Sequence, residues 1–266
     1  MSNVYQELIT KMAEATPQSE DYTGEDGLLY CGKCRTPKQR YFPEGLKTLG
    51  IDRHRIDCEC EKAQRLEHEA AEQRRKHLDT VEDLKRRCFS AERMATWNFE
   101  NDNGNTPQME YARRYVENWD KMKADNLGFY LWGDTDSGKS YLAACIANGL
   151  IEKEISVRMT NFTTILNDLG ASFEGRNEYI ERLCRFPLLI IDDLGCEVAN
   201  NFTLSCLYNV INTRIIMHKS TIINTNLSDK ELRSRYTDRI FSRILGEFTT
   251  LYFRGHDIRE QKLSKK

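Results

Sequence analysis

The sequence has no long apolar run, no excess of charge of one sign and no internal repeat. No stretch reaches the roughly 18 apolar residues that a membrane-spanning helix needs, and the first residues lack the charged and apolar regions of a signal peptide. We therefore expect a cytoplasmic protein without a membrane partner. The formal net charge is −2 over 266 residues, so binding to nucleic acid would require a local basic surface.

Nine cysteines are present, and in a reducing compartment they are expected to be thiols or metal ligands rather than disulfides. Four of them form two close pairs, Cys31 with Cys34 and Cys58 with Cys60, in a short polar segment. Four thiolates in two pairs suit a tetrahedral structural Zn²⁺ site, and His54 is an available substitute ligand. A redox C-x-x-C motif and unliganded thiols remain as alternatives. The other cysteines are expected to pack in the interior: Cys88, Cys145, Cys184, Cys196 and Cys206.

Residues 133–140 read Gly-Asp-Thr-Asp-Ser-Gly-Lys-Ser, a complete G-x-x-x-x-G-K-S phosphate-binding loop. Gly133 and Gly138 allow positive φ, so that successive backbone N–H groups can turn toward phosphate oxygens. Lys139 is expected to reach the β- and γ-phosphates of ATP, and Ser140 to offer its hydroxyl to Mg²⁺.

The sequence around this loop has the pattern that the motif requires. An apolar strand is predicted over 129–132 and a helix from Tyr141 onward, whose N-terminus would face the phosphates. The alternative is a glycine-rich turn that binds no nucleotide. The predicted nucleotide-binding residues are Gly133, Asp134, Thr135, Asp136, Ser137, Gly138, Lys139, Ser140 and Tyr141.

A second apolar run, over 187–192, ends in two carboxylates. A buried parallel strand is apolar throughout, and its carboxyl end faces the ligand crevice. Asp192 is therefore predicted to hold Mg²⁺ directly or through water, and Asp193 to polarise the attacking water as a general base. The alternative is a strand that simply meets a turn.

A third apolar run, over 220–225, is followed by Asn226, which is predicted to orient the attacking water. Asn224 lies one alternation step away on the same side of the strand, and a plain turn remains possible for Asn226. Arg239 and Arg243 lie four residues apart and share a helical face. They are either solvated or an arginine finger that completes the site of a neighbouring subunit.

Alternation of apolar runs with helical patterns from residue 108 onward predicts an α/β fold, with a parallel sheet flanked by helices on both faces. The segment before it interleaves basic and acidic residues and predicts a solvated helix. The expected divisions are a cysteine-rich module over 1–60, a charged helical linker over 61–95 and the ATPase domain over 96–266.

Taken together, these motifs resemble the AAA+ ATPases of the helicase-loader group, the DnaC/DnaI type and its phage relatives, with IstB-type transposition ATPases as cousins. The resemblance covers roughly residues 95–262, and Gly24–Cys60 is similar to the cysteine-bearing N-terminus of phage and Gram-positive members. It rests on five segments: Gly133–Ser140, Leu189–Gly195, Thr225–Leu227, Asp238–Arg243 and Phe253–Arg259.

The resemblance implies an AAA+ P-loop core and a slow, partner- or DNA-stimulated ATPase. It implies that Arg243 is the trans-acting finger with Arg239 as neighbour or alternative, and that Arg259 contacts the subunit's own nucleotide. Loaders of this group bind a hexameric replicative helicase through their N-terminal region, assemble on it as a ring or spiral, and place it on single-stranded DNA under the control of ATP. A transposition regulator on duplex DNA and a nucleotide-binding adaptor without turnover are the alternatives.

Two loop residues bear on the affinity for nucleotide. Asp134 and Asp136 place carboxylates beside the triphosphate, which weakens nucleotide binding unless they point outward or assist the metal.

Weak or ATP-dependent contacts to single-stranded DNA are expected from aromatic and basic side chains, each of which could instead be core or cap. The candidates are Arg158, Asn161, Phe162, Asn201 and Phe202, together with the tail residues Lys262, Lys265 and Lys266.

Overall fold

The computed structural model describes residue 18 and residues 20–43, 52–102, 104, 106–171 and 175–254. The chain divides into two compact units, Met1–Lys76 and His77–Lys266. This division falls inside the charged segment 61–95, and the predicted boundaries at 60 and 95 stay predictions. The predicted nucleotide contact Arg259 and the basic tail residues lie outside the described residues.

The smaller unit consists of two short antiparallel ladders followed by the start of a helix. β1 pairs with β2 and β3 pairs with β4. Within its described residues, the buried apolar side chains are Leu28, Cys31 and Cys58. So small a core cannot account for folding without a further stabilising element. The bounds are β1 Tyr22–Thr23, β2 Leu29–Tyr30, β3 Gln39–Tyr41 and β4 Arg53–Arg55.

Helix α2 runs over Glu59–Cys88 and a 3₁₀ turn, η1, follows over Glu92–Thr96, where a solvated helix was expected. Acidic residues lie in its first turn and basic residues in its last, which suits the helix dipole. Residues 62–76 are all exposed, whereas Val81 and Cys88 are buried in the larger unit. Among the described helices, none has both the length and the apolar composition of a membrane-spanning segment.

The larger unit is built on a five-stranded sheet of order β6-β7-β8-β5-β9, in which every pair of neighbours is parallel. The predicted α/β class is confirmed, and four of the strands overlap the apolar runs of the sequence over 129–132, 155–159, 187–192 and 220–225. The edge strand β9 was not predicted. The bounds are β5 Phe129–Gly133, β6 Val157–Asn161, β7 Leu188–Leu194, β8 Ser220–Thr225 and β9 Thr249–Phe253.

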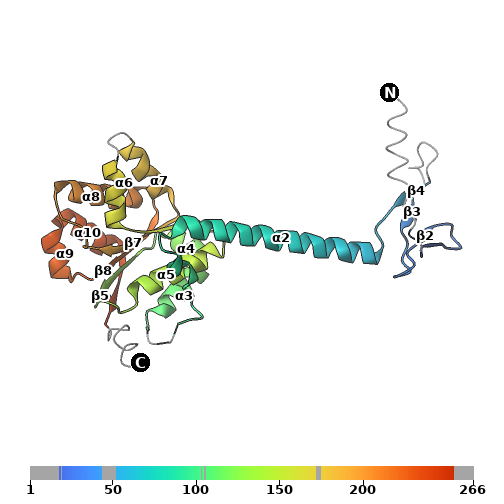
Figure 1. The fold of residues 1–266 in the computed structure, drawn as a ribbon, viewed down its shortest axis with the longest axis horizontal. Coiled ribbons are helices and arrows are strands. Elements are labelled where there is room, and N and C mark those ends of the chain that lie inside the picture. The colour runs from blue at the N-terminus through green and yellow to red at the C-terminus, as the bar shows by residue number, and fades with distance from the viewer. Residues whose placement is uncertain are drawn as a thin grey trace. The chain divides into compact units, whose positions relative to one another are not determined.

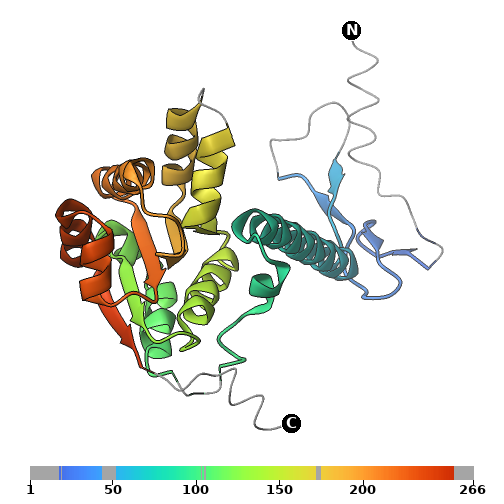
Figure 2. The same ribbon diagram turned by 60° about the vertical axis from the view of Figure 1, so that its left-hand side comes forward.

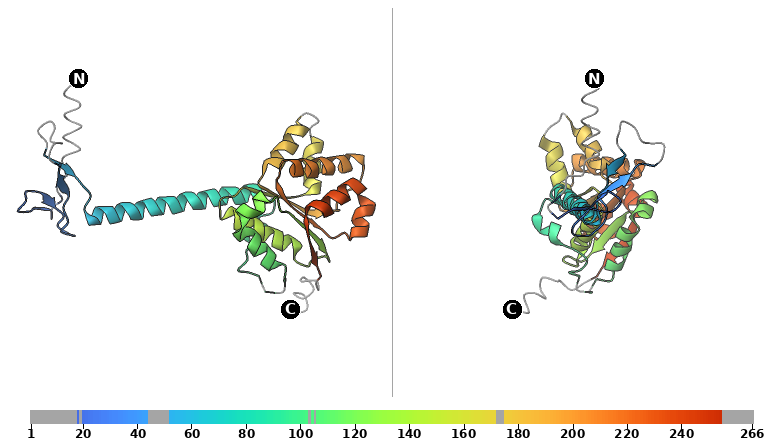
Figure 3. Two further views of the ribbon diagram at one scale, coloured as in Figure 1. Left: turned by 180° about the vertical axis from the view of Figure 1, so that it is seen from behind. Right: turned by 90° about the vertical axis from the view of Figure 1, so that its right-hand side faces the viewer.

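Helices cover both faces of this sheet (Figures 1 and 2). One face packs against α3, α4 and α5, and the other against α6 to α10, so that two apolar cores enclose the sheet. The view from behind in Figure 3 shows the same two layers. The bounds are α3 Met109–Glu117, α4 Trp119–Ala124, α5 Lys139–Ile151, α6 Phe162–Ala171, α7 Arg176–Arg185, α8 Asn201–Ile216, α9 Asp229–Arg235 and α10 Asp238–Glu247.

A fully buried arginine, Arg214 of α8, fixes the amino ends of the neighbouring strands β7 and β8. Its guanidinium donates to the carbonyls of Cys184 and Phe186 at 3.0 and 2.9 Å, to the Thr221 hydroxyl at 2.8 Å and to the carbonyl of Ser220. Burial lowers the pKa of Arg214 to about 10. Arg214 thus holds the amino ends of β7 and β8. Their carboxyl ends lie at the opposite edge of the sheet, where the site forms.

Candidate nucleotide-binding site and cysteine cluster

The phosphate-binding loop joins β5 to α5 in a conformation that requires glycine at both of its glycine positions. Gly133 and Gly138 have φ of 132° and 97°. A Cβ atom at Gly133 would lie 2.0 Å from the carbonyl oxygen of Phe253, and the backbone N–H of Asp134 donates to that same oxygen at 3.0 Å. The end of β9 therefore holds the start of the loop in place.

Lys139 is buried inside the loop, with 6% of its surface exposed. Its Nζ atom donates to the carbonyl oxygens of Gly133 and Asp134 at 3.0 and 2.6 Å, and to Ser137 Oγ at 3.3 Å. Burial lowers the pKa of Lys139, against the opposing effect of nearby carboxylates, the largest from Asp193. An ammonium group enclosed by oxygens in this way is placed to meet an anion at the mouth of the loop.

The predicted Mg²⁺ ligands Ser140 and Asp192 lie in direct contact. The Ser140 hydroxyl donates to Asp192 Oδ1 at 2.8 Å, and the Asn224 amide donates to the same oxygen at 2.6 Å. Burial and then the charge of Asp193 raise the pKa of Asp192, while these two hydrogen bonds act against the rise. A hydroxyl and a carboxylate side by side are suitable ligands for Mg²⁺.

Asp193 follows in a distorted stretch of β7. The register with β8 shifts between Ile191 and Leu194, and Asp193 is exposed with φ of 51°, a left-handed conformation that is unfavourable for a residue other than glycine. The distortion directs Asp193 into solvent and Asp192 into the protein, so two adjacent carboxylates have different surroundings.

Asn224 rather than Asn226 is the asparagine that contacts this centre. Asn224 is 1% exposed, and its Oδ1 atom has no hydrogen-bond partner although it is buried. Asn226 is exposed beyond the end of β8. Alternation places both asparagines on the same side of the strand, so the sequence signal that favours Asn224 is its position inside the apolar run 220–225.

The two predicted finger arginines both lie on α10. Arg239 is exposed, and the Arg243 guanidinium lies 5.5 Å from the ring centre of Tyr208 on α8.

On the other side of the loop, the Tyr141 hydroxyl donates to the carbonyl of Asn98 at 2.8 Å, and its ring lies 5.5 Å from that of Trp97. Sequence reasoning missed this segment beside the loop, because nothing in its pattern marks it as part of a site. Thr135 is exposed and Asp136 half-buried.

The structure narrows the candidates for DNA contact. Phe162 is fully buried, which agrees with the core alternative, so it cannot stack on a base. Asn161 caps α6 through its side-chain oxygen, and Arg158 donates to a backbone carbonyl near the end of α2. Phe202 is 37% exposed and lies under an arginine guanidinium of α7, and Asn201 is exposed beside it.

The four predicted zinc ligands meet in the smaller unit. The sulfur atoms of Cys31, Cys34, Cys58 and Cys60 all lie within 4.8 Å of one another. Tetrahedral zinc with bonds of about 2.3 Å separates its sulfurs by about 3.8 Å, so the donor set fits a structural Zn²⁺ ion. His54 lies outside this group, its ring 4.8 Å from that of Phe42. Of the remaining cysteines, Cys196 is exposed, and four are buried as expected: Cys88, Cys145, Cys184 and Cys206.

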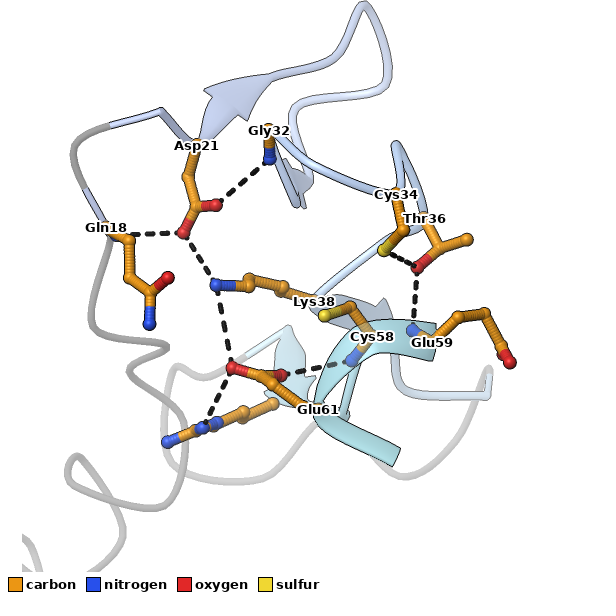
Figure 4. Close-up of polar contacts among 10 residues, drawn as sticks. Gln18, Asp21, Gly32, Cys34, Thr36, Lys38, Cys58, Glu59 and Glu61 are labelled. Atoms are coloured by element: carbon orange, nitrogen blue, oxygen red, sulfur yellow. Dashed lines mark hydrogen bonds and ion pairs between the residues drawn. The ribbon is translucent and has the colours of Figure 1, made fainter. Parts of the chain in front are cut away.

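A polar network ties this cluster to the strands around it (Figure 4). The buried Lys38 lies between Asp21 at 2.7 Å and Glu61 at 3.5 Å. Glu61 also accepts the backbone N–H of Cys58 at 3.1 Å, and the Thr36 hydroxyl accepts that of the first residue of α2 at 3.0 Å. A buried cation beside these cysteines would offset part of the negative charge that a four-cysteine zinc centre carries.

The strand–loop–helix geometry, with its enclosed lysine and the adjacent serine and aspartate, defines a P-loop nucleotide-binding protein. The sequence profile described as "IstB-like ATP binding protein" matches residues 67–265. The chain belongs to this family.

Two of the curated proteins that the chain is similar to are named replicative helicase loaders. The replicative helicase loader DnaC of Buchnera aphidicola subsp. Baizongia pistaciae is 25% identical over 156 residues, which are 56% of this chain and 62% of that protein. The replicative helicase loader DnaI of Bacillus subtilis is 28% identical over 113 residues, 41% of this chain and 36% of that protein. The chain therefore spans less than two thirds of the length of these relatives.

The fold is shared with a solved structure. The crystal structure of the DnaC helicase loader superimposes with a TM-score of 0.56 at 21% sequence identity, covering 62% of this chain and 100% of that one. The predicted AAA+ P-loop fold is thereby confirmed.

Proposed function

We propose that this protein is an ATP-dependent loader that places a hexameric replicative helicase on single-stranded DNA during the initiation of replication. The observation that carries the proposal is the meeting of Lys139, Ser140 and Asp192 at the carboxyl edge of the sheet, in a chain whose relatives are named helicase loaders. Hydrolysis is expected to be slow and stimulated by the helicase or by DNA.

Each residue of the site has its own role in the proposed reaction. The loop N–H groups and Lys139 bind the phosphates, and Ser140 and Asp192 hold Mg²⁺, which neutralises phosphate charge when bound. Asp193 takes a proton from the attacking water, and Asn226 orients that water. Asn224 holds Asp192 in place through its hydrogen bond. Arg243, or Arg239 in its stead, stabilises the transition state in a neighbouring subunit, so the site is complete only in an assembled ring or spiral. Arg259 contacts the subunit's own nucleotide.

The N-terminal module is proposed to bind zinc as a structural brace and to dock on the helicase. Four cysteine ligands leave no open coordination position, so the metal has no catalytic role. Metal analysis of the purified chain tests this part directly, with about one Zn²⁺ per chain expected and none after Cys31→Ser with Cys34→Ser.

ATP hydrolysis with helicase and single-stranded DNA tests the enzyme assignment. Lys139→Ala is expected to abolish turnover, and Arg243→Ala to lower it by about 10³–10⁵ in the assembled state, as arginine fingers do. Arg185→Ala is the matched control, because Arg185 is an exposed arginine on α7 paired with Glu181. If the wild type hydrolyses ATP no faster than Lys139→Ala under every condition, the protein is a nucleotide-binding adaptor instead.

A second function is favoured by the family profile itself, since it is that of IstB-like proteins. Such a protein would regulate DNA transposition. Co-purification with a hexameric helicase supports the loader, whereas filaments on duplex DNA formed without helicase would support the transposition ATPase. Electron microscopy of the chain with ATP and each DNA separates the two.

A further inference from the structure

A buried carboxylate, Glu197, is not used by the reaction proposed above. It lies just after β7 with 4% of its surface exposed, although the next residue, Val198, is 78% exposed. An ionised carboxylate is costly to bury unless its oxygens accept hydrogen bonds. The partners of Glu197 therefore indicate what it does.

Glu197 has partners on two separate segments. Its Oε2 atom accepts the backbone N–H of Gly195 at 3.0 Å, and its Oε1 atom accepts the hydroxyl of Tyr236. Its backbone carbonyl accepts the guanidinium of Arg235. Tyr236 is 3% exposed, and both burial and the Glu197 carboxylate raise the pKa of its phenol, which therefore stays protonated as a donor.

The first segment is the turn that carries Asp193. Asp193 and Gly195 both have left-handed backbone, with φ of 51° and 106°, and the N–H of Cys196 donates to the carbonyl of Asp193 at 3.3 Å. The side chain of Leu227 closes over Gly195, where an added Cβ would lie 2.6 Å from it. The left-handed conformation of Asp193 persists only when surrounding contacts hold it, and the Glu197 carboxylate, which accepts the N–H of Gly195 in the same turn, supplies one of these contacts.

The second segment is the junction between α9 and α10. Tyr236 ends α9 and is followed by Thr237, the N-cap of α10. Helix α10 carries Arg239 and Arg243, so the direction in which it leaves the junction sets where both guanidinium groups are presented. One buried carboxylate thus contacts the turn of the proposed base and the junction that precedes the arginine-bearing helix.

We propose that Glu197 is a positioning residue that couples the Asp193 turn to α10. In this role it acts through Gly195 and Tyr236 rather than on the nucleotide. Because it fixes both segments at once, displacement of Asp193 is transmitted to the arginines that serve the neighbouring site. This role rests on the proposed ATP hydrolysis, and the experiment below is chosen so that the two can fail separately.

The test uses the full chain with Mg-ATP, helicase and single-stranded DNA, and the variants Glu197→Ala, Glu197→Gln and Tyr236→Phe. Glu197→Ala is expected to lower kcat by about 10- to 100-fold through misplacement of the base and the finger. KM for ATP should change by less than about threefold, because the phosphate-binding loop is untouched. Glu197→Gln, which keeps an acceptor for the Gly195 N–H, is expected to recover most of the kcat. Tyr236→Phe, which removes only the phenolic donor, is expected to give an intermediate loss.

Hydrogen exchange supplies a readout that does not depend on turnover. In Glu197→Ala and Tyr236→Phe, amide exchange is expected to rise together in 193–197 and in α10, with α5 unchanged. Tyr179→Phe is the matched control, because the Tyr179 hydroxyl also donates to a carboxylate, that of Asp168 at 2.7 Å, away from the site.

Several outcomes overturn the coupling: an unchanged kcat in Glu197→Ala, an effect on KM alone, or exchange that rises in the turn while α10 stays protected. If Glu197→Ala does not fold, the comparison of Tyr236→Phe with Tyr179→Phe decides. If the wild type shows no more hydrolysis than Lys139→Ala, the proposed ATPase fails, and the exchange pattern still decides whether the two segments are coupled.

Discussion

Burial and the adjacent charge of Asp193 both raise the pKa of Asp192, while hydrogen bonds from Asn224 and Ser140 favour the ionised form without fully offsetting them. A carboxyl whose pKa is higher in the folded than in the unfolded state binds more protons when folded, so its contribution to stability falls as pH rises. At neutral pH without Mg²⁺, the ionised Asp192 therefore destabilises the larger unit.

Replacement of this carboxylate should stabilise the protein while it stops the reaction. Asp192→Asn keeps an oxygen for Ser140 and Asn224, and is expected to raise the free energy of unfolding at pH 7 by about 1 kcal/mol. For a unit of this size that is about 2–4 °C in Tm, with ATP hydrolysis lost. Thermal unfolding in the absence of Mg²⁺ measures it, and the gain should shrink as the pH is lowered. Asp238→Asn, at an exposed pair with Arg233, is the control and should change little.

The two asparagines of β8 should separate stability from turnover. Asn224→Ala removes a buried donor from Asp192 and is expected to cost about 1–3 kcal/mol. Asn226→Ala, at an exposed position, should stay within about 0.5 kcal/mol but lower hydrolysis if it orients the water. Denaturant unfolding of both variants provides the comparison. Equal losses of stability would contradict the assignment of Asn224 as the residue that holds Asp192.

At this scale the sequence predicts residues whose roles depend on local spacing and misses those that depend on contacts far apart in the chain. Lys139 and Ser140 belong to one motif, so their contacts with the loop and with Asp192 were foreseeable. Glu197 and Tyr236 are 39 residues apart, and no local pattern links them. Only the folded chain brings the end of α9 beside the turn that follows β7.

At the scale of elements, the cysteine cluster and α2 share their first turn. Cys58 immediately precedes the first residue of α2, and Cys60 lies in the first turn. Beyond them the side chains of 62–76 are exposed, and a helix without tertiary packing is marginal at such a length. A metal bound by Cys58 and Cys60 would fix the dihedral angles of that turn, which is the costly step of helix formation.

Removal of the proposed zinc ion should therefore loosen the first half of α2 and spare the second. A chelator is expected to raise amide exchange in 59–76 by at least about tenfold, with little change in 77–88, where buried side chains hold the helix. Cys60→Ser should reproduce the effect, and Cys196→Ser, an exposed cysteine elsewhere, should not. Protection of 59–76 that survives removal of the metal would contradict this dependence.

The strands show why one element was missed. The four strands on which prediction succeeded are mostly buried runs, because helices cover both faces of the sheet. Strand β9 lies at the edge beside β5, and its exposed positions, Thr249, Thr250 and Tyr252, interrupt the apolar pattern. An edge strand of this kind lacks the continuous apolar run by which the other strands were predicted, although here it holds the phosphate-binding loop.

At the scale of the whole molecule, two compact units are expected to respond to different ligands. Calorimetry of the full chain should show one transition lowered by a chelator and another raised by Mg-ATP. At an ATP concentration of 100 times Kd, the second unit should gain about 2.7 kcal/mol. A single transition shifted by both additions would contradict the independence of the units.

The exposure of residues 62–76 has a consequence for how this gene can vary. With no side chain of that stretch buried, selection acts there on helix propensity and on the balance of charge rather than on the identity of any residue. In a saturation mutagenesis screen, most substitutions in 62–76 should be neutral, with proline as the clear exception. The flanking segments, which hold the cysteines on one side and Val81 and Cys88 on the other, should tolerate far fewer changes.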